Sequence, residues 1–202
     1  MKKILFIFTM LLVLNITFAQ DSTFESKIAS TSLENKTIQC DFEQHKKVKN
    51  IKNTIITKGK FYYDNGGKMS LIYNEPKGDK VLIFGENFTI VTAGKKIESS
   101  ASDNPMMMQI CNMLQACMSG DVSKLGRGWQ RNIKEDEAQY YVELRTEDRR
   151  IKKYIDSLIL KFEKTDMTLN EMQTNETSGG FTIYKFTNKV INKQIDSQKF
   201  KL

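Results

Sequence analysis

Short segments in which apolar and polar residues alternate follow one another along most of the chain. Ile38, Cys40 and Phe42 alternate with polar neighbours, as in a β-strand that is buried on one face. Turn sequences such as Asp64-Asn65-Gly66-Gly67 and Glu75-Pro76-Lys77-Gly78 separate these segments, so consecutive strands should pair as hairpins. The pattern predicts about eleven strands, over residues 37–48, 54–63, 68–74, 80–84, 88–93, 129–134, 138–146, 154–162, 167–174, 181–187 and 197–202.

Two segments instead have the spacing of helices. Phe24, Ile28 and, less regularly, Leu33 fall on one side of a short helix predicted over residues 22–33. The sequence Ser102-Asp103-Asn104-Pro105 supplies a helix cap and an early proline, and it precedes a predicted helix over Met106–Met118.

A long series of antiparallel strands has to curl, because twist accumulates from each strand to the next. We therefore predict a mainly β protein, an incomplete antiparallel β-barrel with an α-helical lid over its mouth. After the N-terminal segment is removed, residues 20–202 suit one domain.

The N-terminus is typical of a cleavable secretory signal. Lys2 and Lys3 precede an apolar run over residues 4–14, and small residues follow at Thr17 and Ala19. The run is too short to cross a bilayer as a helix. We expect residues 1–19 to be a signal peptide and the mature protein, which begins at Gln20 rather than at a lipidation cysteine, to be soluble in the periplasm.

The net charge is +7, and it falls to +5 without the two lysines of the predicted signal peptide. The densest basic cluster consists of Lys46, Lys47, Lys49 and Lys52. A solvated surface explains this cluster, and attraction to anionic lipid is the alternative. No recognised motif accompanies the charge, so nucleic acid is not an expected partner.

Three cysteines, Cys40, Cys111 and Cys117, leave at least one unpaired in an oxidising compartment. On a helix, Cys111 and Cys117 would be roughly 9 Å apart, beyond the limit of about 7 Å for a disulfide. Cys40 could pair with either of them, or all three could be small buried apolar residues.

The sequence offers no set of catalytic residues. The single histidine, His45, would lie roughly 17 Å from Cys40 along a strand and on its opposite face, too far for a nucleophile and base. Motifs for zinc, phosphate loops, dinucleotides and serine hydrolases are missing. We predict neither a catalytic site, nor a metal site, nor a cofactor.

The most unusual feature is the methionine-rich helix, which contains five of the ten methionines: Met106, Met107, Met108, Met113 and Met118. Ordinary core packing explains it, and so does an apolar surface that must adapt to ligands of variable shape. We predict that this helix covers an acyl-chain cavity on the inner face of the sheet. The predicted lining residues are Phe42, Phe61, Tyr63, Met69, Leu71, Tyr73, Phe88, Ile90, Met107, Ile110, Met113 and Leu114.

The mature chain resembles the periplasmic outer-membrane lipoprotein carriers of the LolA family. The matching features are Phe42-Glu43-Gln44, Gly59-Lys60-Phe61, Leu71-Ile72-Tyr73-Asn74-Glu75-Pro76, Gly85, a helix ending near Gly120, and Asn192, Ile195 and Phe200. The resemblance implies an incomplete β-barrel with helical lids. It also implies a carrier that takes acylated lipoproteins from an inner-membrane ABC-type release complex to an outer-membrane acceptor, here expected to act as a monomer and not as an enzyme.

One departure from the family concerns the lid. Many carriers have an Arg-Pro pair whose arginine fastens the lid, and Asn65-Gly66 stands at that place here. We therefore expect apolar contacts of Met107, Ile110, Met113 and Leu114 to hold the helix instead.

Other functions are compatible with this architecture. A lipid-binding or lipoprotein-sensing module for another envelope lipid is the main alternative. A secreted hydrolase lacks its nucleophile and base, and an outer-membrane barrel would need an apolar outer band where these strands carry lysines.

Overall fold

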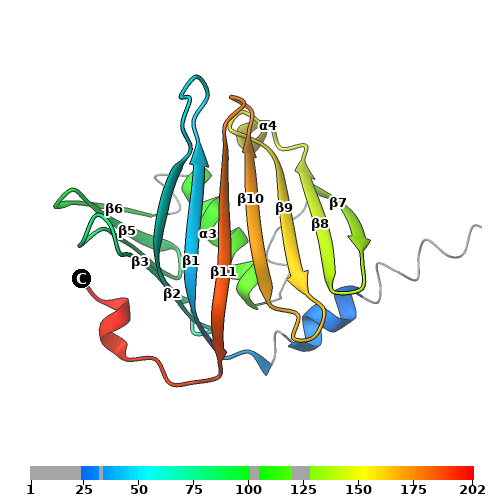
Figure 1. Cartoon of the computed structure of the whole chain (residues 1–202), viewed down its shortest axis with the longest axis horizontal. Helices are drawn as coiled ribbons and strands as arrows, with labels where there is room; N and C mark the ends of the chain where they lie inside the picture. The colour runs from blue at the N-terminus through cyan, green and yellow to red at the C-terminus, as the bar shows by residue number, and fades with distance from the viewer. Residues whose placement is uncertain (1–23, 32–33, 101–104, 120–127) are drawn as a thin grey trace, which may run out of the picture.

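The computed structural model describes residues 24–31, 34–100, 105–119 and 128–202, with side chains of the 105–119 segment described from residue 112 onward. The predicted signal peptide and its cleavage point lie outside these residues. One antiparallel sheet of eleven strands, in the order β6-β5-β4-β3-β2-β1-β11-β10-β9-β8-β7, forms the body (Figure 1). Its strands are β1 Thr37–Lys47, β2 Ile55–Asp64, β3 Lys68–Tyr73, β4 Lys80–Phe84, β5 Asn87–Thr92, β6 Lys95–Ser100, β7 Trp129–Glu135, β8 Gln139–Thr146, β9 Ile155–Glu163, β10 Leu169–Glu176 and β11 Phe181–Ile191.

The sheet is open, because the order ends at β6 on one side and at β7 on the other. The predicted fold class, an incomplete antiparallel barrel of about eleven strands, is therefore confirmed. Strand β1 lies at the centre, paired with β2 on one side and β11 on the other. This pairing joins β1 and β11, the first and last strands in the sequence, and leaves β6 and β7 as the edges of the sheet.

The count of eleven strands was right through two errors that offset each other. Strand β6 was not predicted, because Ile97 is its only large apolar residue and lies exposed. The predicted strand over 197–202 is wrong: the 3-10 helix η2, Ser197–Phe200, begins there, and the carboxylate of Asp196 accepts the Gln198 backbone N–H. The remaining ten predicted strands are present with small differences at their ends.

Helices occupy the inner side of the curled sheet and its ends. Helix α3, Pro105–Ser119, lies behind the sheet as drawn in Figure 1 and confirms the predicted helix. Residues 24–31 are also helical, as predicted, and Phe24 and Ile28 are buried, whereas Leu33 lies outside the described residues. The short helix α4, Arg149–Lys152, was not predicted; the Asp148 carboxylate caps it by accepting the Arg150 backbone N–H.

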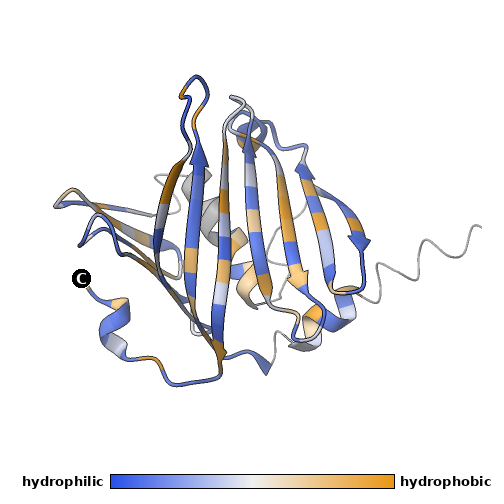
Figure 2. Ribbon diagram, viewed as in Figure 1, coloured by the Kyte–Doolittle hydropathy of each residue, from blue (hydrophilic) through white to orange (hydrophobic). Residues whose placement is uncertain are grey.

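Alternation along the strands builds the core. Bands of apolar and polar residues succeed one another along the strands in Figure 2, and the inward residues of β1, β2 and β3, such as Phe42, Phe61 and Met69, are fully buried. Phe24 packs against Tyr140 and Phe162, with ring centroids 5.1 and 5.6 Å apart. The N-terminal helical segment is thereby fixed to the β8–β9 part of the sheet.

The cysteines Cys40 and Cys117 are free and buried, which agrees with their interpretation as small apolar residues. Burial raises the pKa of each thiol to about 12, so both stay protonated at neutral pH. The side chain of Cys111 is outside the described residues.

Gly59 marks the closest approach between strands near the centre of the sheet. It lies opposite Phe42 on β1, and a Cβ atom at this position would be 2.2 Å from the Ile72 carbonyl oxygen and 2.7 Å from the Phe42 ring. Backbone cannot yield as a flexible side chain can, so only glycine fits here.

We expect Gly59→Ala to lower the free energy of unfolding by at least about 2 kcal/mol, because the added methyl overlaps backbone and ring atoms. Urea unfolding followed by circular dichroism measures this change. Ile56→Ala, at an exposed position of the same strand, is the matched control and should change stability little. Equal stability of Gly59→Ala and the parent protein would show that β2 can move away from Phe42.

Candidate functional site: an apolar pocket inside the curled sheet

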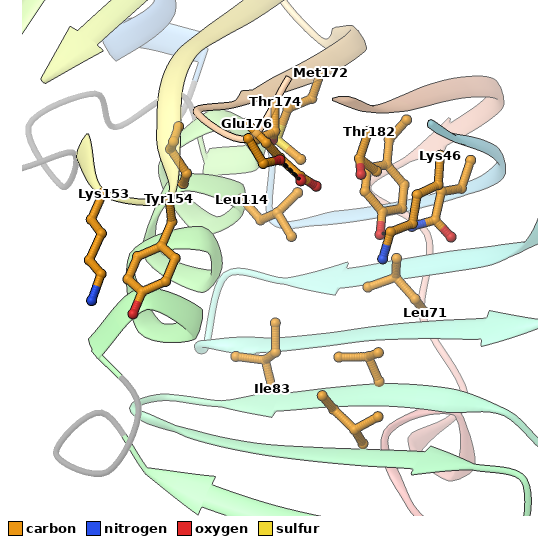
Figure 3. Close-up of a pocket in the computed structure, with 16 residues that line it drawn as sticks. Lys46, Leu71, Ile83, Leu114, Lys153, Tyr154, Met172, Thr174, Glu176 and Thr182 are labelled. Atoms are coloured by element: carbon orange, nitrogen blue, oxygen red, sulfur yellow. Dashed lines mark hydrogen bonds between the residues drawn. The ribbon is translucent and has the colours of Figure 1, made fainter. Parts of the chain in front are cut away.

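A pocket of about 450 Å³ lies inside the curl, between the β3–β5 part of the sheet and the β9–β11 part (Figure 3). Its apolar lining comes from both parts and from α3. Those residues are Leu71, Val81, Ile83, Ile90, Leu114, Ile155 and Met172. The sheet thus folds back far enough for its two halves to enclose a single apolar space.

The polar atoms at the base of the pocket bind one another. The Gln44 side-chain amide donates to the Tyr184 hydroxyl at 2.7 Å and accepts from the Thr57 hydroxyl at 2.8 Å. Tyr184 also hydrogen-bonds Tyr73. Burial holds the pKa of Tyr184 well above its usual value, so these partners stay neutral and present no charge to an apolar ligand.

Charged groups are instead found at the mouth of the pocket. Lys46, Lys153 and Glu176 belong to its lining, and Figure 3 shows the two lysines on opposite sides of it. The Ser178 hydroxyl donates to the Glu176 carboxylate at 2.9 Å. An amphipathic ligand with an apolar body and an anionic head would find both environments here.

Three of the twelve predicted cavity residues, Leu71, Ile90 and Leu114, line this pocket. Six others are buried in the surrounding core: Phe42, Phe61, Tyr63, Met69, Phe88 and Met113. Tyr73 is partly buried and packs on that core. The side chains of Met107 and Ile110 lie outside the described residues.

The half of the pocket that sequence reasoning missed comes from β9, β10 and β11. Met172, Thr174 and Glu176 alternate along one face of β10, which was visible in the sequence. No local pattern indicates that this face of β10 lies opposite Leu71 across the pocket, because the position of β10 relative to β3 depends on how far the sheet curls.

The outer face of the sheet holds the single histidine. The His45 imidazole contacts the Glu43 carboxylate, which also pairs with Lys58 at 2.7 Å. Lys58 and His45 together lower the pKa of Glu43 to about 2. Over the part of the chain that the structure describes, no cluster of three or more His, Cys, Asp or Glu side chains could hold a metal ion.

No helix in the described ranges is long and apolar enough to cross a membrane. A family model described as "Outer membrane lipoprotein carrier protein LolA" matches residues 34–202, which is most of the chain. The chain belongs to the LolA family. The resemblance seen in the sequence is thereby confirmed, and the fold of this family is one that binds and carries lipid or lipoprotein. No curated protein matches the sequence significantly.

Solved structures agree with this fold at low sequence identity. An uncharacterized conserved protein from Thermus thermophilus has a TM-score of 0.55 at 7% identity, over 90% of this chain and 94% of that one. A DUF1329 family protein from Desulfovibrio piger has a TM-score of 0.51 at 8% identity, over 89% and 96%. The Pseudomonas aeruginosa MucA/MucB complex contains a chain with a TM-score of 0.55 at 10% identity, over 90% of this chain and 60% of that one.

The C-terminal half of α3 packs into the core of this LolA-family protein through apolar side chains. Met113, Leu114, Cys117 and Met118 are buried. Asn65, which the resemblance places where many carriers have the arginine of the lid, is exposed, and no hydrogen bond joins its side chain to another described residue. Fastening of the lid by apolar contacts remains a prediction.

We expect the α3 amides to exchange slowly only when ligand is bound, because acyl chains would add apolar contacts that the empty protein lacks. Hydrogen exchange with and without a fatty acid measures this, and opening should depend little on salt. Asn65→Ala is the matched variant and should leave the exchange unchanged. Strong protection of α3 without ligand and no gain when ligand is added, or loss of protection in Asn65→Ala, would show that polar bonds hold the lid.

We expect Leu71→Glu to weaken fatty-acid binding by at least about a hundredfold, since an unpaired carboxylate in an apolar pocket costs several kcal/mol. Fluorescence titration measures the affinity, and circular dichroism checks the fold. Ile97→Glu makes the same chemical change at an exposed site and should bind normally. Unchanged affinity of a folded Leu71→Glu protein would place the ligand elsewhere. Phe61 is a poorer test position, because it is fully buried in the core.

Proposed function

We propose that this LolA-family protein is a periplasmic carrier, not an enzyme, and that it binds the acyl chains of lipoproteins in the pocket inside its sheet. The observation that carries this proposal is the apolar pocket of about 450 Å³ with a neutral base and lysines at its mouth. Acyl chains would occupy the apolar part, and the lipid-modified end of the cargo would lie near Lys46 and Lys153.

Such a carrier is needed because exposing acyl chains to water has a large free-energy cost. Each methylene that leaves water contributes about 0.8 kcal/mol, so a lipoprotein with several acyl chains does not cross an aqueous space unaided. A carrier must cover those chains and still release them. The apolar part of the pocket, lined by Leu, Ile, Val and Met side chains, favours burial without fixing one ligand shape.

The pocket as it stands suits one ligand of moderate size, since small-molecule sites span roughly 300–1,000 Å³. A cargo with three acyl chains would require it to enlarge. Helix α3 is the element to displace, because Leu114 lines the pocket and the apolar side chains of Met113 and Cys117 beside it are buried in the core. Acyl chains would then replace the contacts that α3 gives up.

The family membership supports a route for this cargo. In the proposed route the chain, exported by its signal peptide, receives lipoproteins from an inner-membrane ABC-type release complex and delivers them to an outer-membrane acceptor. It acts as a monomer.

A second candidate function is a lipid-binding or lipoprotein-sensing module of the same fold. The similarity to a chain of the MucA/MucB complex favours it, because that protein was solved bound to a protein partner. The two functions differ in what the pocket holds in cells. A sensor would retain one lipid, whereas a carrier would hold many different lipoproteins.

Mass spectrometry of the material that co-purifies with the protein from the cell envelope tests the proposal. We expect several acylated lipoproteins with the parent protein, and their loss with Leu71→Glu. Ile97→Glu is the control and should retain them. A single lipid species without lipoproteins would favour the sensing module, and identical material from the parent and Leu71→Glu proteins would contradict both.

A further inference from the structure

Three segments meet at the end of the molecule where the pocket opens: the β1–β2 loop over 48–54, α4 with residues 153–154, and the β10–β11 loop over 177–180 (Figure 1). The Thr177 amide donates to the Tyr154 carbonyl at 3.0 Å, and its hydroxyl donates to the Lys152 carbonyl at 2.7 Å. A methyl group on Gly179 would lie 3.9 Å from the Lys49 side chain. These segments, together with the adjoining ends of β1 (Lys46 and Lys47) and β2 (Ile55 and Ile56), therefore form one continuous surface, which we call the mouth surface.

The mouth surface is strongly basic. Residues 46–54 contain four lysines and no acid, and residues 147–154 contain four basic and two acidic residues. Both acids already have partners, since Asp148 pairs with Arg150 at 2.8 Å and Glu147 with Lys152 at 3.6 Å. The third acid at the mouth, Glu176, accepts from the Ser178 hydroxyl. Six cations remain, and none of them forms an ion pair with another described residue: Lys47 is half-buried, and Lys46, Lys49, Lys52, Arg149 and Lys153 are exposed.

Exposed apolar side chains accompany these cations. Ile51, Ile55, Ile56 and Tyr154 are 47%, 49%, 54% and 46% exposed, and they are half of the large apolar side chains exposed within the described residues. The other four are spread over the rest of the molecule. Such a concentration on one surface points to a binding function.

The β1–β2 loop has a defined shape that presents these groups outward. The Lys47 ammonium donates to the Ile51 and Lys52 carbonyls at 2.6 and 2.5 Å, and the Ile51 amide donates to the Val48 carbonyl at 3.1 Å. Lys47 is thus used to close the loop. Ile51, Lys49 and Lys52 remain at its tip, free to meet a partner.

We propose that the mouth surface docks onto an anionic phospholipid bilayer. Lysines near a membrane surface are attracted by anionic lipid, and their long stems allow the neighbouring apolar groups to reach below the headgroups. Isoleucine at a loop tip and tyrosine beside lysine are suited to that boundary. Lysine charge favours phosphate headgroups, which is why we assign a lipid surface and not an uncharged protein surface.

Docking in this orientation would place the pocket mouth against the membrane, because Lys46, Lys153 and Tyr154 belong to both the mouth surface and the pocket lining. An acyl chain could then pass between bilayer and pocket with little exposure to water. This second step rests on the proposed function, whereas the docking itself does not.

Sedimentation with vesicles tests the docking. We expect the protein to bind vesicles of equal parts phosphatidylcholine and phosphatidylglycerol, to bind phosphatidylcholine alone much more weakly, and to lose most binding at high salt. Lys49→Glu with Lys52→Glu should weaken binding to the anionic vesicles about tenfold or more. Ile51→Ser with Ile55→Ser should remove the part of the binding that persists at high salt.

The matched control is Lys134→Glu with Lys193→Glu, which makes the same change in net charge with two exposed lysines at the opposite end of the sheet. This control variant should bind the anionic vesicles with an affinity within about twofold of that of the parent protein. Equal losses in both double variants would show that net charge alone attracts the protein and would overturn the proposal. So would equal binding of the parent protein to both kinds of vesicle, which would show that anionic headgroups play no part. Absence of binding to either kind would also overturn it and would leave a protein as the partner of this surface.

A fatty-acid titration on the same variants separates this proposal from the proposed function. Lys49, Lys52, Ile51 and Ile55 do not line the pocket, so their variants should bind fatty acid normally. Vesicle binding without fatty-acid binding by the parent protein would contradict the carrier function and leave the docking intact. Fatty-acid binding without vesicle binding would contradict the docking and leave the carrier function intact.

Discussion

Strand twist is the constraint on which the rest of this structure depends. An antiparallel sheet of this width cannot remain flat. Because this sheet does not close into a barrel, other elements must cover its apolar concave face. Helix α3 and the segment over 24–31 supply part of that cover. The part they leave open is the pocket, so the same twist that shapes the fold also creates the candidate binding site.

Local patterns in the sequence were sufficient for most of the elements. Alternation and turn residues located ten strands, and the cap and proline before Met106 located α3. The failures occurred where the alternation was misleading. Strand β6 lies at an edge and carries Lys95 and Lys96, which protect an edge from pairing but remove the apolar signal. Residues 197–202 alternate as a strand would, yet Asp196 caps a helical turn there.

The binding site was less predictable than the fold, for a physical reason. Periodicity shows which side chains share a face of a strand, but it does not show which of them touch each other and which border empty space. Phe61 and Leu71 occupy the same face of the sheet, yet Phe61 packs against Phe186 with ring centroids 5.5 Å apart and Leu71 borders the pocket. Which residues of β10 and β11 lie opposite Leu71 depends on the curl of the whole sheet. That curl is the accumulated twist of all its strand pairs.

The separation between packed core and open pocket has a consequence for how a lipid carrier can work. Large aromatic side chains around Phe42, Phe61 and Phe162 are fully buried and stabilise the sheet whether or not ligand is present. The pocket can therefore remain loosely packed without unfolding the protein, and adaptable side chains can accept different acyl chains. The charges lie outside this apolar space, on the mouth surface, where they can attract an anionic membrane without weakening the burial of hydrocarbon. Stability, the proposed cargo binding and the proposed membrane attraction thus depend largely on different residues of one curled sheet.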